Sequence, residues 1–124
     1  VLGFEWDEVR DNGALPPGLI RLSTTRIAVD PAKIRSGYSY SPTGVVTHSL
    51  SLYRHGSGAL VFGAGTIQWS WGLDAYHDIP GPAADSRMQQ ATVNLFADMG
   101  VQPATLQPGL APAPRSADAL SPNP

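Results

Sequence analysis

The clearest alternation of apolar and polar residues runs from Val46 to Arg54. Because neighbouring side chains of a strand point to opposite faces, one face of this segment would carry Val46, His48, Leu50 and Leu52. The pattern predicts a half-buried strand. A small-residue turn follows at residues 55–58, and another apolar segment begins at Ala59, so the sequence predicts an antiparallel β-hairpin.

The rest of the N-terminal part contains two further strand-like segments. Residues 1–6 are apolar enough for a short buried strand, and residues 18–29 are rich in β-forming residues and predict a longer one. Residues 30–35 are compatible with one helical turn, and the small residues at 36–44 predict a loop. Residues 75–84 have no periodicity and predict a surface loop.

The segment from Gly58 to Asp74 combines a buried-type strand, a glycine-containing turn and two tryptophans. In an extended chain Trp69 and Trp71 would share a face. An exposed pair of this kind would favour stacking with a sugar or an aromatic ligand. Beneath a helix the same pair would be part of the core, which is the interpretation that we favour.

One helix is predicted towards the C-terminal end. It begins at Asp85 or Ser86, where Ser86 and Gln89 have the spacing of a capping box, and Gly100 stands where a left-handed C-cap is expected. A stripe at three- and four-residue intervals contains Met88, Ala91, Thr92, Leu95, Phe96 and Met99. We expect this stripe to cover the sheet.

Prolines alternate with alanine, serine and glycine from Gln107 onward, a composition too poor in apolar side chains to form a core. We therefore divide the chain into a domain at residues 1–106 and a tail or linker at residues 107–124. The predicted fold class is α/β, with a partial sheet of about four to five strands, a β-hairpin and one long C-terminal helix.

Composition narrows the function classes. The chain has 124 residues, 42% of them hydrophobic and 15% charged, which is typical of one globular domain. A net charge of -2 without clustered lysine or arginine argues against nucleic acid as a partner. No apolar run is long enough for a membrane span, and the absence of cysteine leaves the compartment undecided, with an extracellular or cell-surface location slightly favoured. Since Val1 is not a start methionine, we expect a longer parent protein.

Two carboxylates and one histidine are candidates for chemistry. Glu5 and Asp7 are two residues apart, so on a strand both would lie on one face and could bind a metal or perform acid-base work. The alternative is that the strand ends near Trp6, that Asp7 and Glu8 are solvated loop residues, and that Glu5 is a cap or pairs with an arginine. His77, beside Asp78, is a candidate pocket residue or a plain loop histidine.

Other candidate motifs are weaker. His48 lies on the apolar face of its strand, where a hydrogen-bonded core histidine is expected, and His55 is expected to be a solvated turn residue. Ser70 lacks the surroundings of a nucleophile elbow, and Gly63-Ala-Gly65 lacks the third glycine of a dinucleotide site.

Three ordered blocks of the sequence resemble one family. They are Gly3-Phe-Glu-Trp-Asp7 with the Pro16-Pro17 strand that follows, the glycine-rich strand and turn at Gly58–Leu73, and the helical block at Ser86–Phe96. Together they are similar to the C-terminal domain of the large (β) subunit of N,N-dimethylformamidase. The resemblance spans about residues 1–106.

The resemblance implies a glutamine-amidotransferase-type fold and hydrolysis of a formamide C–N bond at a mononuclear iron held by tyrosines and a glutamate. Glu5 falls in the motif that could supply the carboxylate, whereas the tyrosines would lie upstream of Val1. Two positions depart from the family pattern: Gly72 stands where serine is usual, and Tyr76 or His77 stands where asparagine follows. These departures weigh against amidase activity.

We therefore expect the C-terminal part of an N,N-dimethylformamidase-like domain from a large multi-domain bacterial protein. Its partner would be the upstream part of the same domain, its ligand a small amide or carbohydrate, and its pocket candidates Asp7, Trp69, Trp71 and His77. Residues 1–124 alone are expected to be inactive and to bind no iron tightly. The alternative is a non-catalytic structural or binding module of an extracellular bacterial protein, which recognises carbohydrate or protein.

Overall fold

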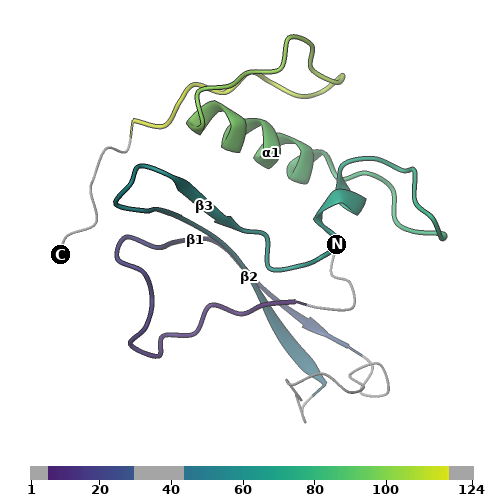
Figure 1. The fold of residues 1–124 in the computed structure, drawn as a ribbon. Helices are drawn as coiled ribbons and strands as arrows, with labels where there is room; N and C mark the ends of the chain where they lie inside the picture. Colours follow the sequence, from purple (N-terminus) through teal and green to yellow (C-terminus); the bar gives the residue numbers. More distant parts are fainter. Residues whose placement is uncertain (1–5, 30–43, 118–124) are drawn as a thin grey trace. The chain divides into compact units, whose positions relative to one another are not determined.

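The computed structural model describes residues 6–29 and 44–117. This part contains the strands β1 (Ile20–Ala28), β2 (Val45–Arg54) and β3 (Leu60–Gly63), the 3-10 helix η2 (Trp69–Gly72) and the α-helix α1 (Ser86–Asp98) (Figure 1). Strands and helix together confirm the predicted α/β class. The described residues fall into two compact units, one with the three strands and one with η2 and α1.

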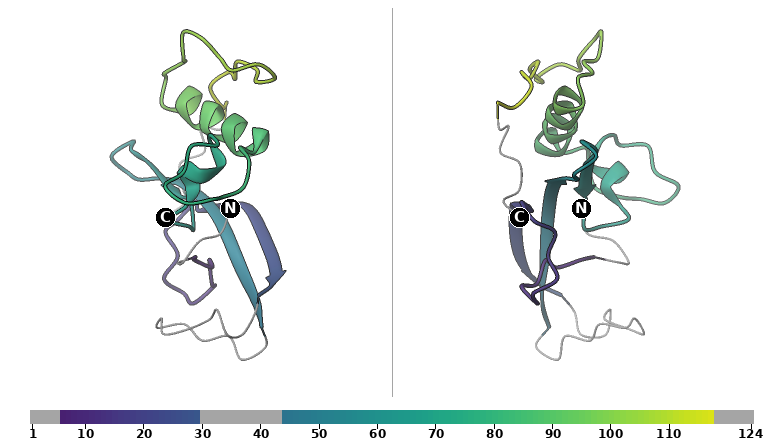
Figure 2. Two further views of the ribbon diagram at one scale, coloured as in Figure 1. Left: turned by 90° about the vertical axis from the view of Figure 1, so that its right-hand side faces the viewer. Right: turned by 60° about the vertical axis from the view of Figure 1, so that its left-hand side comes forward.

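The strands form one antiparallel sheet in the order β1-β2-β3, with β2 in the middle (Figure 1 and Figure 2). Between β2 and β3, the His55 N–H donates to the Ala59 carbonyl at 2.9 Å and the Gly58 N–H donates to the His55 carbonyl at 2.8 Å. Gly58 has a φ of 89°, a conformation that glycine adopts without a steric penalty. These contacts confirm the predicted hairpin.

The predicted inner face of β2 is buried at Val46 and His48, whereas Leu50 and Leu52 on the same face are only half-buried. Val46 is 5% exposed and His48 9% exposed, while Ser49, on the opposite face, is also buried. The strand predicted at residues 18–29 is confirmed as β1, with a register irregularity between Arg21 and Ser23. Of the strand predicted at residues 1–6, only Trp6 belongs to the described residues, and the helical turn at 30–35 and most of the loop at 36–44 lie outside them.

Asp85 is the N-cap of α1. The predicted capping box of Ser86 and Gln89 is therefore wrong. The Asp85 carboxylate accepts the Arg87 N–H at 2.9 Å and makes two further bonds to the Arg87 guanidinium, at 3.0 and 2.6 Å. These hydrogen bonds, the side-chain ones above all, lower the pKa of Asp85 to about 2. Gln89 instead donates from its side chain to the Leu73 carbonyl at 2.7 Å.

The predicted C-cap of α1 is confirmed. Gly100 has a φ of 79°, its N–H donates to the Ala97 carbonyl, and the Val101 N–H donates to the Phe96 carbonyl, each at 2.9 Å. This pair of bonds is a Schellman motif, which satisfies carbonyls that the last turn of a helix leaves free.

The buried side of α1 differs from the predicted stripe. Its buried residues are Val93 and Ala97, whereas Phe96 is 41% and Met99 57% exposed. Val93 and Ala97 lie on the arc of the helix between Gln89, which contacts Leu73, and Gln90, which contacts the chain after the helix. The contacts of α1 with Leu73 on one side and with the chain after the helix on the other therefore determine which of its residues are buried. That the stripe covers the sheet stays a prediction.

No helix in the described part of the chain is both long and apolar enough to cross a membrane.

Candidate functional site

The N-terminal segment is joined to the sheet at Asp7. The Asp7 N–H donates to the Gly65 carbonyl, and the Ser49 N–H donates to the Asp7 carbonyl, both at 2.9 Å. The Val9 N–H donates to Oγ of Ser49 at 3.1 Å. If the pairing of Ser51 with Gly63 continued, Ser49 would pair with Gly65, but the Asp7 backbone hydrogen-bonds to both instead.

Gly65 is required at this junction for two reasons. Its φ is 64°, in the left-handed region where other residues are strained. A Cβ at this position would also lie 2.8 Å from Nε2 of His48 and closer still to the Ser49 carbonyl oxygen. The junction thus depends on a residue without a side chain.

His48 is the hydrogen-bonded core histidine that its position in the strand predicts. It is 9% exposed, and its Nε2 lies 2.9 Å from the Ala64 carbonyl oxygen. Because a carbonyl only accepts, Nε2 carries the hydrogen. This bond ties β2 to the turn after β3. His55 is exposed in its turn, as predicted.

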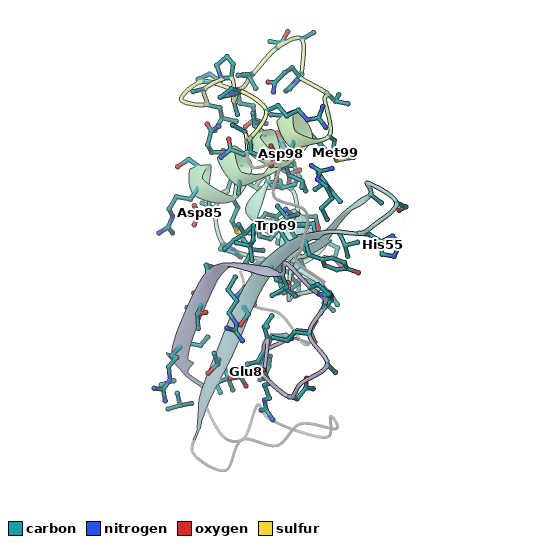
Figure 3. The ribbon with its side chains drawn as sticks, turned by 90° about the vertical axis from the view of Figure 1, so that its left-hand side faces the viewer. Glu8, His55, Trp69, Asp85, Asp98 and Met99 are labelled. Atoms are coloured by element: carbon teal, nitrogen blue, oxygen red, sulfur yellow. The ribbon has the colours of Figure 1, made fainter. Side chains whose placement is uncertain are left out.

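Trp69 and Trp71 do not share the face that alternation predicts, because residues 69–72 form the 3-10 helix η2. Trp69 (labelled in Figure 3) donates from Nε1 to Oγ1 of Thr92 on α1 at 3.2 Å. Gly72 is buried against α1, since a Cβ there would meet the Met88 side chain. Trp69 therefore contacts the helix, but both tryptophans are only half-buried, so the interpretation that the pair belongs to the core stays a prediction.

Trp71 stacks on His77, and this is the pair of predicted site residues that the structure brings together. The ring centroids are 4.6 Å apart with an interplanar angle of 11°. Nε2 of His77 lies 3.1 Å from the carbonyl oxygens of both Trp71 and Asp74, so it is the protonated nitrogen. Gly81 closes the loop over the stack, since a Cβ there would lie 2.5 Å from Nδ1 of His77.

Two other predicted site residues, Asp7 and Glu5, belong to the other compact unit or lie outside the described residues. Asp7 is exposed and belongs to the unit with the sheet, whereas Trp71 and His77 belong to the unit with α1. Glu5 lies outside the described residues. Within residues 6–29 and 44–117, no three histidine, aspartate or glutamate side chains group together in a way that could hold a metal ion.

The sequence contained only part of the signal for these contacts. Ser49 and Gly65, which hold the N-terminal segment, have no local signal for this role, because their partner Asp7 is distant along the chain. The contacts of the tail with α1 have no signal in the sequence, because proline-rich composition alone predicts a linker. In both cases the sequence gives the residue types, but it does not give the residues that they contact.

The strands and helices define an α/β class of protein. At the junction, the block of sequence around Asp7 is hydrogen-bonded to Ser49 and to Gly65, which lies in the glycine-bearing turn before η2. Residues 1–85 match the family model described as N,N-dimethylformamidase beta subunit-like, C-terminal. The match covers more than half of the 124 residues, and the chain belongs to this family. It ends before α1. Comparisons with curated proteins and with solved structures gave no match.

Proposed function

We propose that this chain is the C-terminal part of an N,N-dimethylformamidase-like catalytic domain, which takes part in hydrolysis of an amide C–N bond within a larger protein and is inactive by itself. The family match over residues 1–85 supports the class of protein. The observation that carries the proposal is the junction at Asp7, where the block around Glu5 and the block around Gly65 are joined by hydrogen bonds.

Glu5 is the proposed metal ligand. Chain geometry keeps it within about 7 Å of Asp7, whose backbone is fixed by its bonds to Ser49 and Gly65. The fixed Asp7 backbone limits the region that the Glu5 carboxylate can reach. The remaining ligands of an iron centre, and the further strands of a glutamine-amidotransferase-like sheet, would come from outside the described residues.

The test is an activity assay on the complete protein that contains this chain. Release of dimethylamine from N,N-dimethylformamide is measured for the complete protein and for the 124-residue chain alone. The proposal predicts turnover by the complete protein and none by the isolated chain. Turnover by the isolated chain, or none by an iron-loaded complete protein with N,N-dimethylformamide or other small formamides, would contradict it.

A non-catalytic binding module is the second candidate, and an exposed loop favours it. Tyr76 is 94% exposed and Ile79 51% exposed on the loop that carries the Trp71–His77 stack. Exposed aromatic and apolar side chains are typical of binding surfaces. Saturable binding of a carbohydrate that is lost in Tyr76→Ala would support this candidate. Unchanged tryptophan fluorescence over a panel of sugars would count against a carbohydrate ligand.

A further inference from the structure

The chain that follows α1 returns along the helix and is bound by polar side chains. Gln90 donates from Nε2 to the Ala111 carbonyl and accepts the Ala111 N–H at Oε1, both at 2.9 Å. This segment, residues 107–116, is thereby fixed at Ala111 to the second turn of α1. Towards the end of the helix, the Ser116 N–H donates to Oδ1 of Asp98 at 2.6 Å. The segment therefore runs in the same direction as α1 (Figure 1 and Figure 2).

The contacts on this side of the molecule are made mainly to main-chain atoms. Gln102, just beyond α1, donates from its side chain to the Ala113 carbonyl at 2.8 Å. Gln89 makes a side-chain contact as well, since it donates to the amide oxygen of Gln107 at 2.8 Å. Recognition of this kind reads the course of the backbone and not the identity of the side chains.

Gln90 is suited to this task because its amide has the donor and acceptor of a peptide group. Its pair of bonds with Ala111 has the form of a hydrogen-bonded pair in an antiparallel sheet. The second Nε2 hydrogen donates to Oδ1 of Asn94 at 2.9 Å, one helical turn away. Asn94 is therefore a positioning residue that holds the Gln90 amide towards the segment.

The sequence of the segment favours an extended conformation before it binds. Pro112 and Pro114 fix their own φ, and each also disfavours helical geometry in the alanine that precedes it, Ala111 or Ala113. A peptide that is already extended loses less entropy on binding. The composition that prevents a core thus favours docking onto α1.

A cavity of about 460 Å³ remains between the helix and the segment. Its lining includes Gln90, Asn94 and Asp98 on one side, which we call the α1 groove, and residues 112–114 and 116 on the other. The side chains of the segment are therefore not enclosed tightly. Larger side chains would have space here, provided that the backbone keeps its course.

We propose that the α1 groove is a binding site for an extended proline- and alanine-rich peptide, and that residues 107–116 of the same chain occupy it. Because recognition is made through the main chain, a peptide of the same composition from another molecule competes with this resident segment. The proposal is independent of the amide-hydrolase function and of the residues proposed for it.

Amide hydrogen exchange of the 124-residue chain, followed by NMR, tests the resident contact. We expect the Ala111 and Ser116 amides to exchange more slowly than in a free peptide of residues 106–117. Gln90→Ala should accelerate exchange at Ala111 about three- to tenfold, as for the loss of ordinary hydrogen bonds. Gln68→Ala, the same substitution outside the groove, should leave it unchanged. Free-peptide exchange rates in the wild-type chain would contradict the proposal.

The Ala111→Pro variant tests the groove itself, and it leaves every side chain of α1 intact. Its segment lacks the N–H that Gln90 binds, so the groove should accept an unlabelled peptide of residues 106–117 added in solution. We expect a saturable shift of the Asn94 side-chain amide signal, and no such shift when Gln90→Ala is combined with it. No saturable shift, or an equal shift in both variants, would contradict the proposal. Protected Val93 and Ala97 amides verify that α1 remains folded.

Discussion

Replacing Gly65 by alanine should loosen the junction between the N-terminal segment and the sheet. The new Cβ would lie 2.8 Å from Nε2 of His48 and still closer to the Ser49 carbonyl oxygen. A histidine ring could turn away, but Ser49 pairs with Thr24 of β1, so its backbone cannot move as easily. The substitution must therefore move β3, the turn or the Asp7 segment.

The expected magnitude has two parts. A non-glycine residue at a φ of 64° costs about 1–2 kcal/mol, and overpacking against a fixed backbone costs about another 1–3 kcal/mol. Gly58 provides a matched control, because its φ is 89° but nothing lies within 4 Å of a Cβ placed there. Gly58→Ala should therefore show the conformational cost alone.

Amide hydrogen exchange at Ser49, whose N–H donates to the Asp7 carbonyl, measures the difference locally. Gly65→Ala should accelerate this exchange about five- to one-hundred-fold more than Gly58→Ala does, which corresponds to the steric part of the cost. Equal acceleration in the two variants would refute the argument that Gly65 is needed for close approach.

Two further predictions concern the start of α1. Gly72→Ala should cost no more than about 1 kcal/mol in thermal or urea unfolding, because the atoms that the new Cβ meets belong to the flexible Met88 side chain; a larger loss would contradict this. Asp85→Ala should cost about 0.5–2 kcal/mol at pH 7. Folding lowers the pKa of Asp85 from 3.8 to about 2, so its contribution to the free energy of unfolding is complete above about pH 4 and lost as the pH falls through about 2. Unfolding of wild type and Asp85→Ala, followed by circular dichroism at 222 nm as a function of pH, measures this contribution. A constant difference between the two down to pH 1.5 would contradict the second prediction.

The hairpin and α1 could be predicted from the sequence because their signals are local. The alternation in β2 and the small-residue turn before β3 are adjacent in the chain, and Gly100 directly follows the helical pattern. Such segments depend on neighbours within a few residues. The sequence alone could not decide whether Asp85 or Ser86 is the N-cap of α1. Asp85 is the cap because its carboxylate accepts the Arg87 N–H, while its own N–H donates to the Gly72 carbonyl.

The tryptophan segment could not be predicted in this way, because alternation has meaning only in an extended chain. Oγ1 of Thr66 accepts the Gln68 N–H at 3.1 Å, and Gln68 then accepts the Trp71 N–H at 3.2 Å. These bonds begin η2 and end the extended course. Likewise, the stack of Trp71 on His77 depends on the path of a loop for which the sequence has no periodic signal.

The central claim, that this chain supplies Glu5 to a metal site of an amide hydrolase, is tested most directly by iron content. Iron per molecule is measured in the complete protein for wild type, Glu5→Gln and Glu8→Gln. Glu8, in the same segment (Figure 3), is a matched control, since it pairs with Arg10 at 2.9 Å. The account predicts that Glu5→Gln lowers iron affinity at least about tenfold and Glu8→Gln leaves it unchanged. Wild-type iron content in Glu5→Gln at limiting iron would contradict it.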